Sequence, residues 1–443
     1  MRLFRYSRRR PRRPALWTPI LAGSGGRLYR VGKNSFHKSV SRCRIGDHVS
    51  QRPGTPSLLR AINDRSALEL LLTAGPLTRV DLGRMTGLSK VTASQLLARL
   101  QERDLVEVVG TRSAGRGPNA ELYAVRAGCS YSIGVELNPD VAEAAVADVT
   151  GTVIGSVTAP VAAEISAAGG PDSRRLVHDI ALAATADAGI VLADVDDVVI
   201  GMPGVVDPST GDIELSFDLP GWHRGMRDLL ADDLGCDVTF ENDVNLAAVA
   251  ERAEGAGRDV DDMVLLWIGR GVGLAVVLSG HLHRGATGAA GEIGYLPMPG
   301  VPSPASVERP AKGAFQALVG AGAVDELAGE YGIVANGAAA AVRAALAGGG
   351  AAADGFLQAF SHRLALGVAS VCTVVDPALV VVAGEVGAAG GDRLCDMVGE
   401  DVRRIAPVNP RVVPTTVPGA PVLRGAVLTA VDHARQTLFA STE

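Results

Sequence analysis

Three stretches in the second half of the chain, one polar and two rich in glycine, carry the side chains best suited to chemistry. They are Glu241-Asn-Asp-Val-Asn245, Gly269-Arg-Gly-Val-Gly273 and Gly288-Ala-Ala-Gly-Glu-Ile-Gly294. Carboxylates and amides beside glycine loops can make the short, directional hydrogen bonds that adjacent sugar hydroxyls need. The first stretch ends a predicted strand, and ligands of α/β folds collect at strand ends. The pattern therefore predicts a sugar pocket.

The chain has 443 residues, of which 47% are hydrophobic, enough for two or three domains with large cores. It contains no run of 18 uninterrupted apolar residues, so a membrane span is not expected. The five cysteines are scattered and odd in number. They indicate neither a disulfide framework nor a paired-cysteine zinc site, and a reducing cytoplasm is the expected compartment.

Charge is distributed unevenly along the chain. Residues 1–52 hold 14 Lys and Arg and one acidic residue, whereas the remainder holds 28 basic and 47 acidic residues. The basic leader is predicted to be disordered, because it lacks an apolar period. It could be a DNA-grasping arm, a targeting segment or residues added by an upstream start codon, and the last is favoured. No apolar stretch follows its arginines, so a signal peptide is not expected.

Short helices with clear starts and stops follow from Ser57. Thr78 and Asp81 predict a capping box that opens a helix over 79–85, Thr86-Gly-Leu88 a tight turn, and Ser89 the N-cap of a third helix reaching about Arg103. Strands are expected over 105–109 and 121–125, with a basic tip over 110–118 between them. This order is that of a winged helix-turn-helix.

The module between Ser57 and Ala127 contains 10 basic and 7 acidic residues on an otherwise acidic protein, which favours DNA contact. The start of the third helix would approach base edges, and the wing tip phosphates or a minor groove. The predicted DNA-contacting residues are Ser89, Lys90, Thr92, Gln95, Arg112 and Arg116. The alternative is a three-helix module for protein interactions with solvated charges.

From about Gly128 the chain is typical of an independent α/β region. The order of Gly201-Met-Pro-Gly204, Trp222, the three stretches above and His283-Arg-Gly285 resembles the ROK family of repressors, open reading frames and sugar kinases. The resemblance implies a two-lobed actin-like (ribonuclease-H-like) ATPase-type fold, with the sugar in the cleft between the lobes. Members with an N-terminal winged helix-turn-helix are typically transcriptional regulators of carbohydrate use.

The resemblance also implies the positions of the sugar contacts, which are Asn242, Asp243, Glu292, Gly204 and Gly271. Structural roles remain open for some of them: Asp243 or Asn245 could cap the helix expected after Val244, and Glu292 could be a surface acid. Relatives bind a structural zinc through a histidine and a cysteine cluster. This chain has Tyr295 at the histidine position and no cysteine over 296–312, so no metal is expected.

Kinase relatives use the aspartate matching Asp243 as a base and a Gly-Gly-Thr loop to hold ATP phosphates. Here Glu136-Leu-Asn-Pro-Asp140 replaces that loop: Pro139 offers no N–H and Asp140 would repel an anion. We therefore expect no catalytic residue, with Asp243 as a vestigial base position, and no cofactor. The alternatives are an ATP-dependent sugar kinase with a DNA-binding appendage, and a constitutive DNA binder that has lost its ligand.

The predicted organisation is a leader over 1–53, a winged helix-turn-helix over 54–127 and a sugar-kinase-like effector domain over 128–443. Within the effector domain, lobe 1 comprises about 128–245 with a C-terminal helix over 421–443, and lobe 2 about 246–420. The expected function is a sugar-responsive repressor of carbohydrate-utilisation genes. Its partners would be double-stranded operator DNA, a sugar or sugar-phosphate effector, and further copies in a homodimer or homotetramer.

Overall fold

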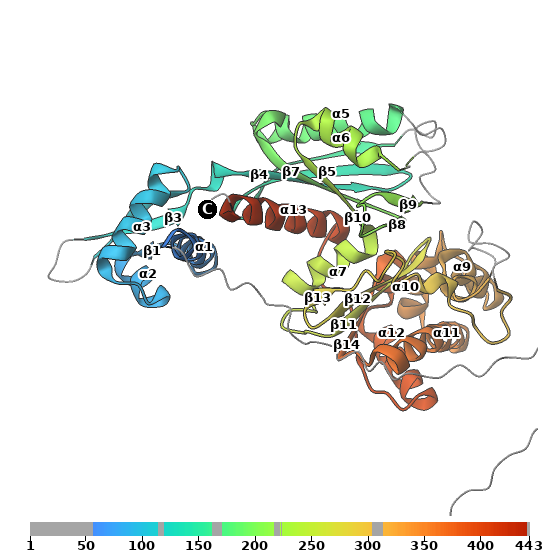
Figure 1. Ribbon diagram of the computed structural model, residues 1–443. Coiled ribbons are helices and arrows are strands. Elements are labelled where there is room, and N and C mark those ends of the chain that lie inside the picture. Colours follow the sequence, from blue (N-terminus) through green and yellow to red (C-terminus); the bar gives the residue numbers. More distant parts are fainter. Residues whose placement is uncertain are drawn as a thin grey trace, which may run out of the picture. The chain divides into compact units, whose positions relative to one another are not determined.

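The computed structural model describes residues 56–113, 119–161, 171–216, 222, 224–303 and 313–440. These residues form a winged helix-turn-helix followed by two five-stranded mixed sheets with flanking helices (Figure 1), which confirms the predicted fold class. The basic leader, predicted to be disordered, lies outside the described residues. Among the helices that the structure describes, none is both long and apolar enough to cross a membrane.

The winged helix-turn-helix has the local structure that its capping residues predict. Thr78 and Asp81 form a capping box at the start of the second helix, Gly87 ends that helix with a φ of +73°, and Ser89 caps the third helix. The sheet order is β1-β3-β2. The elements are α1 (Pro56–Ala74), β1 (Leu77–Thr78), α2 (Arg79–Thr86), α3 (Lys90–Glu102), β2 (Val106–Arg112) and β3 (Ala120–Val125).

The wing strand differs from the prediction. The sequence predicted that the strand ends at Val109 and that a tip begins at Gly110, but β2 continues to Arg112, which is opposite Ala120. A register shift between Val108 and Gly110 carries the strand past the glycine, because a β-bulge absorbs one residue without ending the pairing. Arg112 therefore lies in a strand and not at the tip.

Lobe 1 is built on a sheet of order β10-β7-β4-β5-β6, in which β4, β7 and β10 are parallel and β5 and β6 antiparallel. Two helices, α5 and α6, cover one face and α13 the other (Figure 1). The elements are β4 (Tyr131–Leu137), β5 (Val141–Asp148), β6 (Val153–Pro160), α5 (Pro171–Ala188), β7 (Val195–Met202), β8 (Val205–Val206), β9 (Ile213–Leu215), α6 (Met226–Leu234), β10 (Asp237–Asn242) and α13 (Pro421–Ala440).

Lobe 2 is built on a sheet of order β13-β12-β11-β14-β15. Helices α8 to α12 pack on one face, and α7 and α13 on the other, so α7 and α13 share a core with both sheets. The elements are α7 (Asp243–Glu254), β11 (Met263–Ile268), β12 (Val272–Leu278), β13 (His281–Leu282), α8 (Gln316–Val319), α9 (Ala321–Glu330), α10 (Ala338–Gly348), α11 (Ala351–Val375), β14 (Leu379–Ala383), α12 (Gly384–Ile405) and β15 (Arg411–Pro414).

The contact between α7 and α13 depends on a glycine. A Cβ atom at Gly425 of α13 would lie 1.9 Å from the carbonyl oxygen of Leu246 in α7. We expect Gly425→Ala to lower the free energy of unfolding by about 2 kcal/mol through overpacking, measured by urea denaturation. Gly399→Ala in α12 is the matched control, because a Cβ there would meet no atom closer than 3.6 Å. Its better helix propensity should leave stability unchanged or higher by about 1 kcal/mol, and an equal loss in both variants would contradict the packing argument.

Candidate functional site

The ends of β7 and β10 bring the first predicted sugar contacts together. The Asn242 side chain accepts a hydrogen bond from Asn245 N at 3.1 Å and donates one to Gly204 O at 3.0 Å. Asn242 is thus the N-cap of α7, and the expectation that Asp243 or Asn245 caps a helix beginning after Val244 is wrong. Asn242 is suited to the N-cap position because its side-chain oxygen accepts a hydrogen bond from the backbone N–H of the third helical residue.

Asp243 is the first residue of α7, and its Oδ1 accepts a hydrogen bond from Val244 N at 2.8 Å. The same region holds two further carboxyl groups. Burial raises the pKa of Glu136 to about 7, and the negative charges of Glu143 and Asp243 act in the same direction. Burial and the charge of Asp243 also raise the pKa of Glu292. Asp243 therefore lies within electrostatic range of both Glu136 and Glu292.

Two glycines explain how the loop before Glu292 reaches this region. Gly288 and Gly291 have φ values of +82° and +100°. A Cβ atom at Gly288 would lie 1.9 Å from Val206 O, and one at Gly291 would lie 1.8 Å from Leu274 O. Only glycine permits this approach to β8 and β12. Glu292 is consequently partly buried beside Asp243, and it is no freely exposed surface acid.

An ion pair between the buried Glu241 and the partly exposed Arg284 supports the same site, and the sequence analysis did not single it out. Glu241 is 5% exposed; it accepts hydrogen bonds from Asn242 N and Asn245 Nδ2 and forms an ion pair with Arg284 at 2.6 Å. Both residues lie within motifs quoted above, so the motifs were a signal for their importance. Their pairing was not predictable from spacing, because 43 positions separate them.

Gly271 differs from the other predicted sugar contacts in its exposure and its lack of close neighbours. It is exposed at the turn between β11 and β12, and a Cβ atom there would meet no atom within 4 Å. The turn is held by Gln316, which donates to Arg270 O and accepts from Val272 N. The structure gives no steric reason for glycine at this position.

The chain makes a tight hairpin turn between β4 and β5. Asn138 Oδ1 accepts hydrogen bonds from the backbone N–H groups of Asp140 and Val141. At the end of β4, Glu136 Oε2 accepts a hydrogen bond from Leu423 N at 3.1 Å, in the first turn of α13. A protein carboxyl group thus occupies a helix N-terminus, a position that favours anions.

The described residues contain no group of three His, Cys, Asp or Glu side chains placed to hold a metal ion. Tyr295 lies beside Glu292, and its backbone N–H donates a hydrogen bond to Glu292 O at 3.1 Å. Burial and the charge of Glu292 raise the pKa of Tyr295 to about 12. The hydroxyl group is therefore a neutral hydrogen-bonding group at physiological pH.

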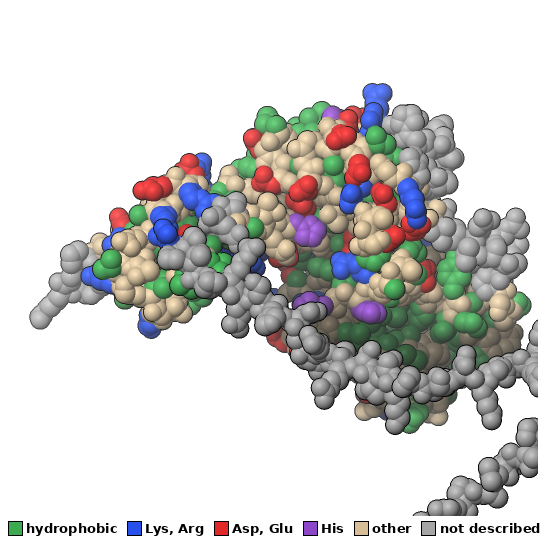
Figure 2. Space-filling view, viewed as in Figure 1, with side chains coloured by type: hydrophobic (Ala, Val, Ile, Leu, Met, Phe, Trp, Pro, Cys, Tyr) green, Lys and Arg blue, Asp and Glu red, His purple; other side chains and the backbone are tan. Residues whose placement is uncertain are grey.

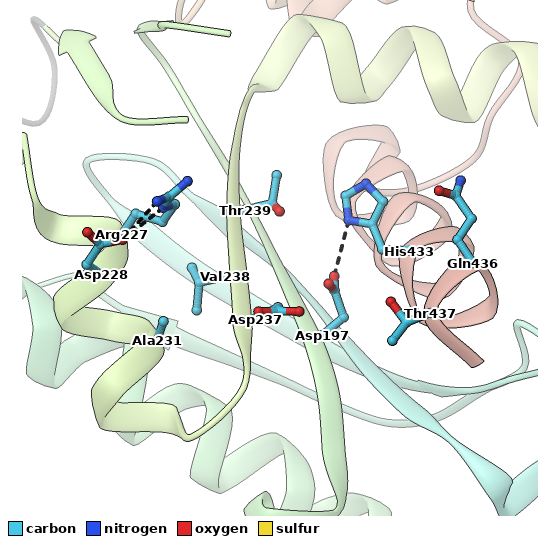
Figure 3. A pocket seen from close by; sticks show the side chains of 10 residues that line it. All are labelled: Asp197, Arg227, Asp228, Ala231, Asp237, Val238, Thr239, His433, Gln436 and Thr437. Atoms are coloured by element: carbon cyan, nitrogen blue, oxygen red, sulfur yellow. Dashed lines mark hydrogen bonds and ion pairs between the residues drawn. The ribbon is translucent and has the colours of Figure 1, made fainter. Parts of the chain in front are cut away.

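A pocket lies at the end of the lobe 1 sheet where β7 and β10 begin, between α6, α13 and the first residues of β7 and β10 (Figure 3). Its side chains include Asp197, which is 6% exposed and lies 3.4 Å from Nδ1 of His433. Burial raises the pKa of Asp197, and the interaction with Asp197 raises the pKa of His433. Asp197 lies near the start of β7, and Asp237 is the first residue of β10. Gly204 and Asn242 lie at or just after the other ends of these strands, so this pocket is separate from the region of Asp243.

On the winged helix-turn-helix, the predicted DNA contacts fall into two groups. Ser89 Oγ accepts a hydrogen bond from Thr92 N at 3.2 Å and lies 2.9 Å from Thr92 Oγ1, so both hydroxyl groups form the helix cap. Lys90 and Gln95 are exposed on α3. Val91, which follows Lys90 on α3, is 66% exposed and was not predicted as a DNA contact. An exposed apolar residue on this helix was the signal that could have identified it.

Most arginines of the winged helix-turn-helix are paired within the module. Arg112 forms an ion pair with Asp81, and Arg99 one with Asp64 at 2.6 Å. Arg112 nevertheless keeps half of its side chain exposed. Arg116 lies outside the described residues. In the view of Figure 2, basic and hydrophobic side chains are interspersed over this module.

The winged helix-turn-helix and the two sheet-based lobes define the class as an actin-like effector domain joined to a DNA-binding domain of winged-helix type. Residues 176–430 match the ROK family and residues 63–117 the MarR family. The ROK match covers more than half of the chain. The protein belongs to the ROK family.

Known proteins similar to this chain include both regulators and kinases. The xylose repressor of Bacillus subtilis (strain 168) is 24% identical over 255 residues, which cover 54% of this chain and 61% of the repressor. A ROK family transcriptional regulator described as a homolog of E. coli MLC protein has a TM-score of 0.69 at 20% identity, over 87% of this chain and 98% of that one. The ROK hexokinase of Thermus thermophilus has a TM-score of 0.57 at 25% identity, over 69% of this chain and 99% of the hexokinase.

Proposed function

We propose that the protein is a sugar-responsive, DNA-binding transcriptional regulator, a repressor of carbohydrate-utilisation genes without kinase activity. The observation that carries the proposal is the combination in one chain of a winged helix-turn-helix with two carboxyl groups, Glu136 and Glu292, whose pKa values are raised by burial and by the charge of Asp243. Its similarity to known regulators supports a role in transcription rather than catalysis. The similarity to the xylose repressor extends over more than half of that protein.

Glu136 supports the absence of kinase activity. Phosphoryl transfer depends on positioning and on neutralising phosphate charge. Here the N-terminus of α13 is already occupied by the Glu136 carboxyl group, and Asp243 lies within electrostatic range of it. A nucleotide phosphate at this place would meet carboxyl groups in place of backbone N–H donors.

One helix, α13, extends from the region of the predicted sugar contacts to the DNA-binding module. The first turn of α13 bonds to Glu136, and at its other end Phe439 packs in the hydrophobic core of the winged helix-turn-helix. Val149, at the end of β5, belongs to the same core. Sugar binding near Asp243 would thus act on a rigid element that reaches the DNA-binding module. Its effect on DNA affinity is limited by the sugar's differential affinity for the two conformations.

We further propose that a homodimer, or a tetramer of two such dimers, places two α3 helices in successive major grooves of a pseudo-palindromic operator. The test is fluorescence anisotropy of the full chain on DNA from its own upstream region, at fixed salt, with a panel of monosaccharides, disaccharides and sugar phosphates. One compound is expected to shift DNA affinity about tenfold. An ATP-dependent assay on the same panel tests the kinase alternative.

Asp243→Ala is expected to abolish this shift while DNA affinity without sugar stays within about twofold of the wild type, because Asp243 lies on α7 and not on the DNA-binding module. Asp228→Ala is the matched control, since Asp228 is an exposed aspartate on α6 of lobe 1. It should leave the shift intact. Phosphorylation of a sugar by the wild type, lost in Asp243→Ala, would reverse the proposal in favour of a kinase.

A further inference from the structure

The outward face of α3 carries two side chains without a structural role in the module. Ala93, Leu96, Leu97 and Leu100 form the buried face of this helix. Val91 and Gln95 lie one turn apart on the opposite side, and Val91 is 66% exposed. Within the described part of the chain, no hydrogen bond involves the Gln95 side chain. Neither residue contributes to the core or to the cap that Ser89 and Thr92 form.

Valine at this position is unfavourable for the isolated module. A β-branched side chain lowers helix propensity, and exposure leaves its methyl groups in water. Contact of the methyl groups with an apolar group of a partner would remove them from water and offset the lower helix propensity. The start of a recognition helix is the part that approaches base edges in the major groove, and there the thymine C5-methyl is the apolar group.

We propose that Val91 and Gln95 read a short thymine- and adenine-containing step of the operator. Val91 contacts a thymine methyl group, and the Gln95 amide pairs with N6 and N7 of an adenine. Positions i and i+4 of a helix are about 6 Å apart, less than two steps of 3.4 Å along DNA, so both residues reach bases within two pairs of each other. Lys90, exposed beside Val91, contacts the backbone phosphate. This inference rests on the proposed DNA-binding function and adds the bases that are read.

The test uses chemical changes in the DNA that remove single groups. The full wild-type chain selects duplexes from a randomised pool at fixed salt, and each thymine of the selected duplex is then replaced by deoxyuridine, which lacks only the 5-methyl group. We expect one thymine, with its symmetry mate, at which the replacement lowers wild-type affinity about fourfold, the factor that one buried methyl group supplies. Replacement of a neighbouring adenine by 7-deazaadenine should lower it as well.

The variants assign each effect to its side chain. Val91→Ala should bind the thymine and deoxyuridine duplexes equally, and Gln95→Ala should become insensitive to 7-deazaadenine. Val80→Ala is the matched control, because Val80 is 67% exposed on α2, outside the proposed reading face, and this variant should keep the deoxyuridine effect. All three variants change exposed residues, so circular dichroism should report an unchanged fold.

Two results would overturn the inference while the proposed function stands. In the first, a duplex is selected but no deoxyuridine replacement lowers wild-type affinity. In the second, Val91→Ala keeps the full deoxyuridine effect. Failure of the wild type to select any duplex from the pool would overturn the proposed DNA-binding function and the base reading together.

Discussion

Replacing Glu251 by alanine is expected to lower the free energy of unfolding by about 3 to 5 kcal/mol. Glu251 lies in α7 and is 0% exposed. Its Oε1 accepts hydrogen bonds from Thr415 Oγ1, Thr416 N and Val417 N, and its Oε2 accepts one from Ala256 N at 2.8 Å. Alanine would leave these partly buried donors without their acceptor and would open a cavity at the end of the helix that carries Asp243.

The loss would be measured by urea denaturation, followed by the fluorescence of Trp222 in lobe 1 and Trp267 in lobe 2. Glu254→Ala is the matched control, because Glu254 lies on the same helix but is partly exposed and pairs with Arg424 at the surface. It should cost at most about 1 kcal/mol. Equal losses in the two variants would show that the buried hydrogen bonds of Glu251 contribute little.

The second large effect is a change in how stability depends on pH. The pKa of Glu136 is about 7 in the folded protein, against an ordinary value of 4.5. Between these pH values the folded state binds more protons than the unfolded chain. The contribution of Glu136 is therefore fully present below pH 4.5 and is lost as pH rises through 7, a loss of about 3 kcal/mol.

Glu136→Gln removes this loss, because glutamine stays neutral and its carbonyl oxygen can still accept the hydrogen bond from Leu423 N. We expect the variant to equal the wild type within about 1 kcal/mol at pH 5 and to exceed it by about 3 kcal/mol at pH 8.5. Urea denaturation at the two pH values is the measurement. Glu107→Gln, on an exposed strand of the wing, controls for the loss of one carboxylate. A variant with the same pH dependence as the wild type would mean that Glu136 is not protonated in the folded state at pH 5 to 7.

The sequence by itself determined the elements whose cause is local. The capping box of Thr78 and Asp81, the turn at Gly87 and the cap at Ser89 follow from interactions over three residues, and the structure has all of them. The order of the glycine motifs pointed to the ROK family for a similar reason. A site that needs positive φ or a close approach requires glycine whatever its neighbours are. The spacing of such glycines can therefore be recognised in the sequence alone.

Local sequence rules could not assign a structural role where several neighbouring side chains were suited to it. Asn242, Asp243 and Asn245 are all suitable caps, and only the structure assigned the cap to Asn242, because the end of β10 sets its backbone. The same applies to α3. The sequence offered six polar or basic contacts for DNA, whereas exposure on the folded helix added Val91 and placed Ser89 and Thr92 in the cap.

Only the tertiary structure decided the long-range side-chain pairs of the two lobes. Glu241 and Arg284 are 43 positions apart, Glu136 and Leu423 are 287 apart, and Glu251 meets Thr416 across 165. Such pairs depend on sheet register and on which helix crosses which face, and neither is encoded in local propensity. The sequence therefore predicted candidate residues for binding a sugar and DNA. The fold decided which carboxyl groups gather beside Asp243 and which helix joins them to the DNA-binding module.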